Sequence, residues 1–127
     1  MVVASKNLER SGLMSGSDQA YVVGQIQPAL EEITISEFFA RTVSRYPDRE
    51  ACIFCQSGER WTWSQLSQKV DQLAAGLLAL GVYKGDRVGI WSPNKPEWVL
   101  AQFATARIGA ILVNINPAYR RAELKYA

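Results

Sequence analysis

Histidine does not occur anywhere in the 127 residues. Catalytic sites that pair histidine with serine or cysteine, and metal sites with imidazole ligands, are therefore excluded within this chain. Long hydrophobic runs are also missing, although 48% of the residues are hydrophobic, which is ordinary for a protein in water. A chain of this length buries one core and not two, so we expect at most one domain.

Charge of one sign is not concentrated in any part of the sequence. The formal net charge is +2, and lysine and arginine are interspersed with acidic residues. We therefore expect no nucleic-acid partner, because that function needs a basic stripe or patch. Near the start, Glu9 interrupts Lys6 and Arg10, and no apolar core of a secretion signal follows. We expect a cytoplasmic location, with the mitochondrial matrix as the alternative, and no transmembrane segment.

Cysteine is scarce, and the two that occur, Cys52 and Cys55, are spaced as CxxC within an apolar run. The run is typical of a strand. Residues three apart on a strand point to opposite faces and lie roughly 10 Å apart, which is beyond the reach of a disulfide. Two buried thiols are therefore favoured over a redox pair or half of a zinc site.

The chain divides into a start rich in serine and glycine and a remainder with clear periodicity. Residues 1–20 are predicted to form a flexible tail. Residues 21–127 are predicted to form the ordered part, in which three helices follow from apolar residues at helical spacing. Each helix has a predicted capping box at its start; the pairs are Thr34 with Glu37, Thr62 with Gln65, and Asn94 with Glu97 around Pro96.

The ends and faces of these helices can also be predicted. Pro47 ends the first helix, and Gly81 closes the second as a left-handed cap. Because residues 73–80 are apolar nearly all round, the carboxyl end of the second helix is expected to be buried. The third helix is predicted over 96–108. The predicted apolar face of the first helix consists of Phe38, Phe39, Thr42, Val43 and Tyr46.

Extended segments complete the pattern. Residues 51–56 and 60–62 are predicted to form a hairpin with Gly58 at the turn. Residues 87–91 and 110–115 are short and apolar, and each follows a helix, which is typical of parallel strands buried on both faces. The expected fold is therefore an α/β layer, a β-hairpin followed by alternating helices and mostly parallel strands.

Several spaced blocks together resemble the AMP-forming acyl-CoA synthetases of the adenylate-forming superfamily, in particular the fatty-acyl and medium-chain acyl-CoA ligase branch. The likeness runs from about Tyr21 onward and implies part of the large amino-terminal domain of such an enzyme. The blocks are YPDREA (46–51), WTWSQL (61–66), LAAGLLALGVYKGDRVGIWSPNKPEWV (73–99) and NINPAYRRAEL (114–124).

The resemblance implies a fatty-acid substrate that is activated by ATP with Mg²⁺ as acyl-AMP and then transferred to coenzyme A. The family handles these groups through later motifs: a Ser/Thr/Gly-rich loop ending in lysine, an aromatic residue followed by Thr-Glu, an aspartate for the ribose, and a distant lysine. None of these motifs is present here. We therefore assign no catalytic, cofactor-binding or metal residue, and we expect an inactive piece whose partner is the remainder of the ligase domain.

Other candidate sites in the sequence favour plainer interpretations. Residues 11–17 lack the lysine of a phosphate loop, so a tail is favoured. Asn116 followed by Pro117 is the ordinary start of a helix, which we favour over a ligand site. Lys84 and Lys95 lie in helix–strand connections and are expected to attract phosphate weakly at most. Core and hairpin packing is favoured over an acyl or adenine pocket for Trp61, Trp63, Trp91 and Trp98.

Two rival functions remain open at this point. The chain could be a stand-alone interaction module that reuses the fold, which the coding sequence after Ala127 would distinguish from a ligase piece. It could also be a small flavodoxin-like nucleotide binder. That alternative is the least favoured, because the loop at 92–94 offers a helix start but no glycine to approach phosphate.

Overall fold

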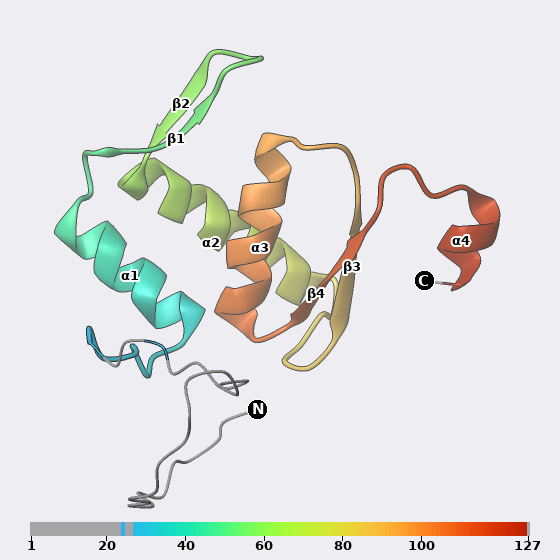
Figure 1. Ribbon diagram of the computed structural model, residues 1–127, viewed down its shortest axis with the longest axis horizontal. Coiled ribbons are helices and arrows are strands. Elements are labelled where there is room, and N and C mark those ends of the chain that lie inside the picture. The colour runs from blue at the N-terminus through green and yellow to red at the C-terminus, as the bar shows by residue number, and fades with distance from the viewer. Residues whose placement is uncertain (1–23, 25–26, 127) are drawn as a thin grey trace, which may run out of the picture. The chain divides into compact units, whose positions relative to one another are not determined.

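The computed structural model describes residue 24 and residues 27–126, which are coloured in Figure 1. The predicted flexible tail, residues 1–20, lies outside the described residues. The chain divides into two units, Met1–Glu31 and Glu32–Ala127, and all of the helices and strands described below belong to the second. In the described part of the chain, no helix is both long and apolar enough to span a membrane.

Helices and strands follow the predicted order. The antiparallel hairpin pairs β1 with β2, and the parallel pair joins β3 with β4 from Arg87↔Ile111 to Trp91↔Ile115. The hairpin, the helices and the parallel pair confirm the predicted α/β pattern (Figure 1). The elements are α1 (Ile35–Arg45), β1 (Glu50–Phe54), β2 (Glu59–Thr62), α2 (Trp63–Ala79), β3 (Arg87–Trp91), α3 (Pro96–Ile108), β4 (Ile111–Ile115) and α4 (Arg121–Tyr126).

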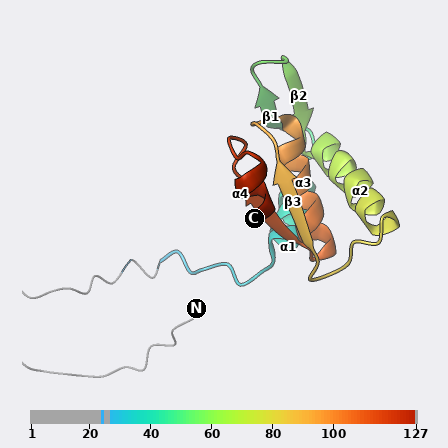
Figure 2. The same cartoon turned by 90° about the vertical axis from the view of Figure 1, so that its right-hand side faces the viewer.

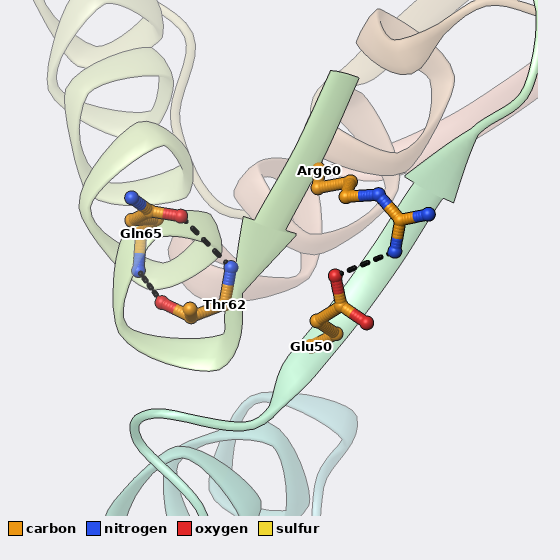
Figure 3. A network of polar contacts seen from close by, with 4 residues as sticks. All are labelled: Glu50, Arg60, Thr62 and Gln65. Carbon is orange, nitrogen blue, oxygen red and sulfur yellow. Dashed lines mark hydrogen bonds and ion pairs between the residues drawn. The ribbon is translucent and has the colours of Figure 1, made fainter. Parts of the chain in front are cut away.

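Two of the three predicted capping boxes are confirmed. At the start of α1, the hydroxyl of Thr34 accepts from the amide of Glu37 at 3.1 Å, and the Glu37 carboxylate accepts from the amide of Thr34 at 2.8 Å. At the start of α2, Thr62 and Gln65 make the same two bonds, at 3.2 and 2.9 Å (Figure 3). Each box satisfies two amides that the first turn of a helix leaves open.

The third capping box is wrong. The helix α3 spans the predicted residues, but its N-cap is Lys95 and not Asn94, and Lys95 makes no side-chain capping bond. The reason is Pro96, whose ring disfavours helical backbone angles in the residue before it. Lys95 accordingly is extended, with φ −141° and ψ 163°. Asn94 therefore lies one residue too early to cap the helix.

The second helix ends as predicted, with a left-handed glycine. Gly81 has φ +84°. The amide of Val82 donates to the carbonyl of Leu77 at 3.0 Å, and the amide of Gly81 donates to that of Leu78 at 3.0 Å. These two bonds form a Schellman motif, which satisfies carbonyls left open at the end of a helix.

Burial of that helix end, however, is not observed. The side chain of Leu78 is 44% exposed and that of Leu80 is 83% exposed, whereas Leu66, Val70 and Ala74 nearer the start of α2 are buried. Apolar composition all round a helix predicts burial only where other elements cover every side. In the described part of the chain, one face of α2 is covered from Leu66 to Ala74, and the last turn of the helix is not.

The core lies where α1, β2, α2 and α3 meet. The rings of Phe39 and Phe103 stack with their centroids 4.5 Å apart, and Trp63 meets Phe39 edge-on at 6.0 Å. The predicted face of α1 is correct at Phe39 but wrong at Phe38, which is 47% exposed with the Arg41 guanidinium 4.9 Å from its ring centre. The buried apolar residues are Phe39, Trp61, Leu66, Val70, Ala74 and Ala104.

Within the described residues, the parallel pair packs against a helix on one face only, so its predicted burial on both faces is not observed there. Leu112 and Asn114 share a shallow pocket with Gln102 and other residues of α3, which places their face against that helix. Trp91 and Ile111 belong to the opposite face and are 50% and 47% exposed. Figure 2 shows β3 in front of α3, with α4 also on the near side of the strands.

Candidate functional site

The carboxyl ends of β3 and β4 form the first candidate site, because ligands of open α/β sheets bind beyond such ends. Trp91 pairs with Ile115 at the last position of the ladder. Ser92 and Asn116 therefore leave the sheet at the same edge. The loop after β3 leads into α3, and the loop after β4 leads into α4.

The polar groups of the first loop are used to shape it. The Ser92 hydroxyl donates to the carbonyl of Pro93 at 3.0 Å, and the carbonyl of Ser92 accepts from the indole N–H of Trp98 at 3.0 Å. Sequence reasoning did not predict the second bond, which ties the loop to the first turn of α3. The sequence indicates this bond only through Trp98 itself, because the N–H of a tryptophan that packs into a protein needs an acceptor.

The second loop is a turn and not the start of a helix, so the predicted helix beginning at Pro117 is wrong. The Asn116 side-chain oxygen accepts from the amide of Ala118 at 2.9 Å, and its carbonyl accepts from Tyr119 at 3.0 Å. Asparagine makes this kind of local turn readily. The helix α4 begins only at Arg121. The amide of Arg120, just before it, donates to the Glu123 carboxylate at 3.1 Å.

The start of α3 offers little to a phosphate. Pro96 has no amide N–H, and the amide of Trp98 donates to the carbonyl of Lys95 at 3.0 Å. Glu97 adds a negative charge in the first turn. Lys84 precedes β3 and so lies at the opposite end of the strand, where its aliphatic stem packs against Gly109. The start of α3 therefore offers few of the convergent donors that bind phosphate groups.

The four tryptophans are distributed over separate elements. Trp61 is buried against the ring of Phe54, 4.7 Å away. Trp63 packs on Phe39, as described above, so packing is confirmed for both. Trp98 is fixed by its bond to Ser92. Trp91 differs from the others, because half of its surface faces solvent on the uncovered side of the strand pair.

The two cysteines have different surroundings. Cys52 is half-buried within β1, and burial raises the pKa of its thiol, which disfavours the reactive thiolate. The prediction that Cys55 is buried is wrong. The strand ends at Phe54, whose carbonyl accepts from the amides of Ser57 and Gly58 at 3.2 and 2.8 Å, so Cys55 lies in the turn and is exposed. Both thiols are free.

A second candidate is a shallow groove of about 340 Å³ between the hairpin and the start of α3. Glu59 is the only charged residue among those that line it. An acidic group disfavours a phosphate ligand. The lining residues are Ile53, Phe54, Cys55, Gln56, Ser57, Glu59, Asn94 and Pro96. Within the described ranges, no group of three His, Cys, Asp or Glu residues could hold a metal ion.

Comparison with known proteins places this framework in one class. The model of the AMP-binding enzyme family matches residues 39–127, which is more than half of the chain. The chain therefore belongs to the AMP-binding enzyme family.

Among the relatives, the mitochondrial medium-chain acyl-CoA ligase ACSF2 of Danio rerio is 50% identical over 108 residues, which are 85% of this chain and 18% of that protein. The chain thus spans about a fifth of the length of this curated relative.

Solved structures of the same class share the fold. A Mycobacterium tuberculosis fatty acyl CoA synthetase matches 73% of this chain and 18% of its own, with 28% identity and a TM-score of 0.70. The N-terminal subdomain of Klebsiella oxytoca NpsA, in complex with anthranilyl-AMSN, matches 73% of this chain and 24% of its own, with 29% identity and a TM-score of 0.69. The predicted class of fold and the predicted family are both confirmed.

Proposed function

We propose that this chain forms part of the amino-terminal framework of an AMP-forming acyl-CoA ligase that acts on a medium- or long-chain fatty acid. The observation that carries the proposal is the family match over residues 39–127. The identity to a medium-chain acyl-CoA ligase supports the substrate class. In such a ligase the fatty-acid carboxylate attacks the α-phosphate of ATP, which releases pyrophosphate, and the thiol of coenzyme A then displaces AMP from the acyl-AMP.

The residues described here do not fit ATP, Mg²⁺ or coenzyme A, so we route no step of this reaction through them. Phosphoryl chemistry needs preorganised donors and cations around the phosphates, and the start of α3 at the carboxyl edge of β3 offers few open amides beside the acidic Glu97. The role of these residues is structural. The bond from Trp98 to Ser92 and the turn at Asn116 fix the two loops at that edge. We propose that the ATP, Mg²⁺ and coenzyme A sites lie in parts of the ligase that this chain does not contain.

We also propose a mitochondrial matrix location for the ligase. The support is the name of the Danio rerio relative, which is a mitochondrial protein. The test is import into isolated mitochondria of a fusion between residues 1–31 and a reporter protein. Protection of the reporter from added protease is expected, whereas a fully digested reporter would favour the cytoplasm.

Pyrophosphate release tests the function. We would supply ATP, Mg²⁺, coenzyme A and a panel of short to long fatty acids to two proteins. One is the chain alone, and the other is a hybrid in which the chain replaces the matching 108 residues of the Danio rerio ligase. We expect no turnover by the chain alone, because loss of even one transition-state donor typically costs about a hundredfold or more in rate. We expect acyl-CoA from the hybrid.

Each outcome is decisive for a different part of the proposal. Turnover by the chain alone would contradict its role as framework. A folded hybrid that makes no acyl-CoA would contradict its role in a ligase. The unmodified Danio rerio ligase, assayed in parallel, sets the scale for both.

A further inference from the structure

The outward side of α2 is a surface that the proposed framework role leaves unexplained. We call the exposed residues that lie opposite the buried stripe of this helix the neutral face: Gln68, Gln72, Ala75, Gly76 and Ala79. They follow one another at spacings of three and four residues, so they share one side of the helix. In Figure 2, α2 runs along the right-hand margin of the helical cluster.

The neutral face carries no charge, because both charged residues of α2 contact neighbouring elements instead. The Nζ atom of Lys69 lies 4.9 Å from the ring centre of Trp61 in β2. The Asp71 carboxylate lies 3.0 Å from the guanidinium of Arg107 in α3. Depletion of charge distinguishes the core of a protein–protein interface from the rest of a protein surface. The neutral face therefore has the composition of an interface.

The two halves of the neutral face differ in side-chain length. The first half presents the long amides of Gln68 and Gln72, whereas the second half presents only alanine and glycine. A Cβ atom added to Gly76 would meet nothing within 4 Å, so the second half is open to a neighbour. If two α2 helices lie antiparallel with Gln72 near the two-fold axis, the long half of each copy lies against the short half of the other. The face is thus complementary to itself, as a two-fold interface requires.

We propose that two copies of the protein associate through an antiparallel pair of α2 helices. Gln68 of one copy then lies against Gly76 of the other, where no side chain opposes it. The two Gln72 side chains meet at the axis, and each brings a donor and an acceptor, so they satisfy each other. Leu78 and Leu80, which are 44% and 83% exposed at the end of α2, gain apolar cover beside this contact. The association does not depend on the proposed ligase function.

The size of the contact sets its expected strength. The helix α2 has 17 residues, so it is about 25 Å long and about 10 Å wide. A stable interface buries about 800 Å² per partner, and a strip of these dimensions supplies only part of that area. We therefore expect a weak, reversible dimer whose share of the protein rises with concentration.

Charge placed at the centre of the neutral face tests the proposal in the hybrid ligase. Gln72→Glu and Gln72→Lys each bring two like charges together at the two-fold axis, which disfavours association. We expect sedimentation velocity to show a sedimentation coefficient that rises with concentration for the parent hybrid, and loss of this rise in each variant. The matched control is Gln56→Glu, which changes an exposed glutamine in the hairpin turn and should leave the rise unchanged.

Mixing the two charged variants distinguishes an interface from a damaged fold. An equimolar mixture of Gln72→Glu and Gln72→Lys places opposite charges at the axis, so it should regain the concentration-dependent rise that each variant lacks alone. A variant that had merely lost stability would not regain association from a partner. Both variants are expected to keep the circular dichroism of the parent, because Gln72 is exposed.

Three results would overturn the inference. The parent hybrid could remain monomeric at every concentration, or both Gln72 variants could associate as strongly as the parent, which would place the contact on another surface. The mixture could also fail to regain the association that each variant has lost, which would remove Gln72 from a two-fold axis. Acyl-CoA formation is measured separately: an active hybrid that stays monomeric contradicts only this inference, and an inactive hybrid that dimerises contradicts only the ligase function.

Discussion

The helical cluster and the parallel strand pair are both rich in apolar residues, yet they differ in how much of that surface is buried. In the cluster of α1, α2 and α3, Leu66 and Val70 are 1% and 0% exposed. On the side of β3 and β4 that faces away from α3, Trp91 and Ile111 remain half exposed. Apolar sequence alone therefore does not predict burial among the described residues, where only the helical cluster covers its apolar side chains on several sides.

The largest expected effect comes from opening a cavity in the cluster. Leu66→Ala should lower the free energy of unfolding by about 2–5 kcal/mol, because it removes three buried carbons where the core cannot easily close. Ile111→Ala should cost about 1 kcal/mol or less, because much of its side chain already meets water. Urea unfolding followed by circular dichroism measures both.

Equal costs of Leu66→Ala and Ile111→Ala would contradict the difference in burial between the cluster and the strand pair. Leu80→Ala is a useful third variant, because Leu80 is the C-cap of the helix that contains Leu66 but is 83% exposed. It should leave the urea midpoint nearly unchanged. A large cost at Leu80 would mean that the end of α2 is buried in solution, as its composition alone predicts.

A smaller effect is expected at the junction between the cluster and the strand pair. Gly81, which ends α2, has φ +84°, where a β-branched side chain is strained. Gly81→Val should therefore cost about 1–2 kcal/mol. Gly76 lies inside the same helix with open space around it. Gly76→Ala should stabilise the chain by about 0.5–1 kcal/mol, since alanine loses less freedom in a helix.

Thermal unfolding of the two glycine variants is the measurement. They must shift the melting temperature in opposite directions. A shift in the same direction would show that the backbone angle at position 81 differs from that in the structure, or that the surface beside Gly76 is occupied.

Local rules account for what the sequence predicted correctly. The bonds of Thr34 with Glu37, and of Thr62 with Gln65, join residues three apart, so spacing alone identifies them. The same rule was wrong at Asn94 because a second local rule, the restriction before proline, decides the N-cap.

The other wrong predictions have a different origin. Burial of Leu80 depends on segments that cover it, and no segment among the described residues does so. Prediction of the candidate site from the sequence was limited in the same way. Sequence reasoning could name the carboxyl edge of the strands, but the bond between Trp98 and Ser92 depends on how a loop meets a helix in space.

The contacts of Arg107 are a further feature that spacing could not predict, because its partners lie on two other helices, α1 and α2. Its guanidinium lies 3.0 Å from the Asp71 carboxylate and donates to the Ser67 hydroxyl at 3.3 Å, and it lies over the ring of Phe39 with 5.6 Å to the ring centre. Because the Asp71 side chain is 59% exposed, we discount the ion pair for screening. Asp71→Asn should cost about 0.5 kcal/mol or less.

Arg107→Ala should cost more than Asp71→Asn, at about 1 kcal/mol, because it also removes the aliphatic stem that packs between the helices. Urea unfolding at low and high salt separates the contribution of the ion pair from the contribution of packing. The cost of Asp71→Asn should shrink with salt, while most of the cost of Arg107→Ala should remain. If both costs vanish at high salt, charge alone joins α2 to α3, and packing at this contact contributes nothing.

The smallest expected effect compares the two confirmed capping boxes, of which only one can titrate. The backbone amide and then the hydroxyl of Thr34 donate to the Glu37 carboxylate and lower its pKa below the ordinary 4.5. The unfolded chain therefore takes up this proton at a higher pH than the folded chain does. The stabilisation is complete above the unfolded pKa and is lost as the pH falls through the folded pKa.

Gln65 makes the equivalent bond to Thr62 without a titrating group. Glu37→Gln should consequently flatten the acid side of the stability profile slightly, measured by urea unfolding between neutral pH and pH about 3, whereas Gln65→Glu should make that side steeper. Parallel profiles for Glu37→Gln and the parent would mean that the carboxylate is not hydrogen-bonded to Thr34 in solution.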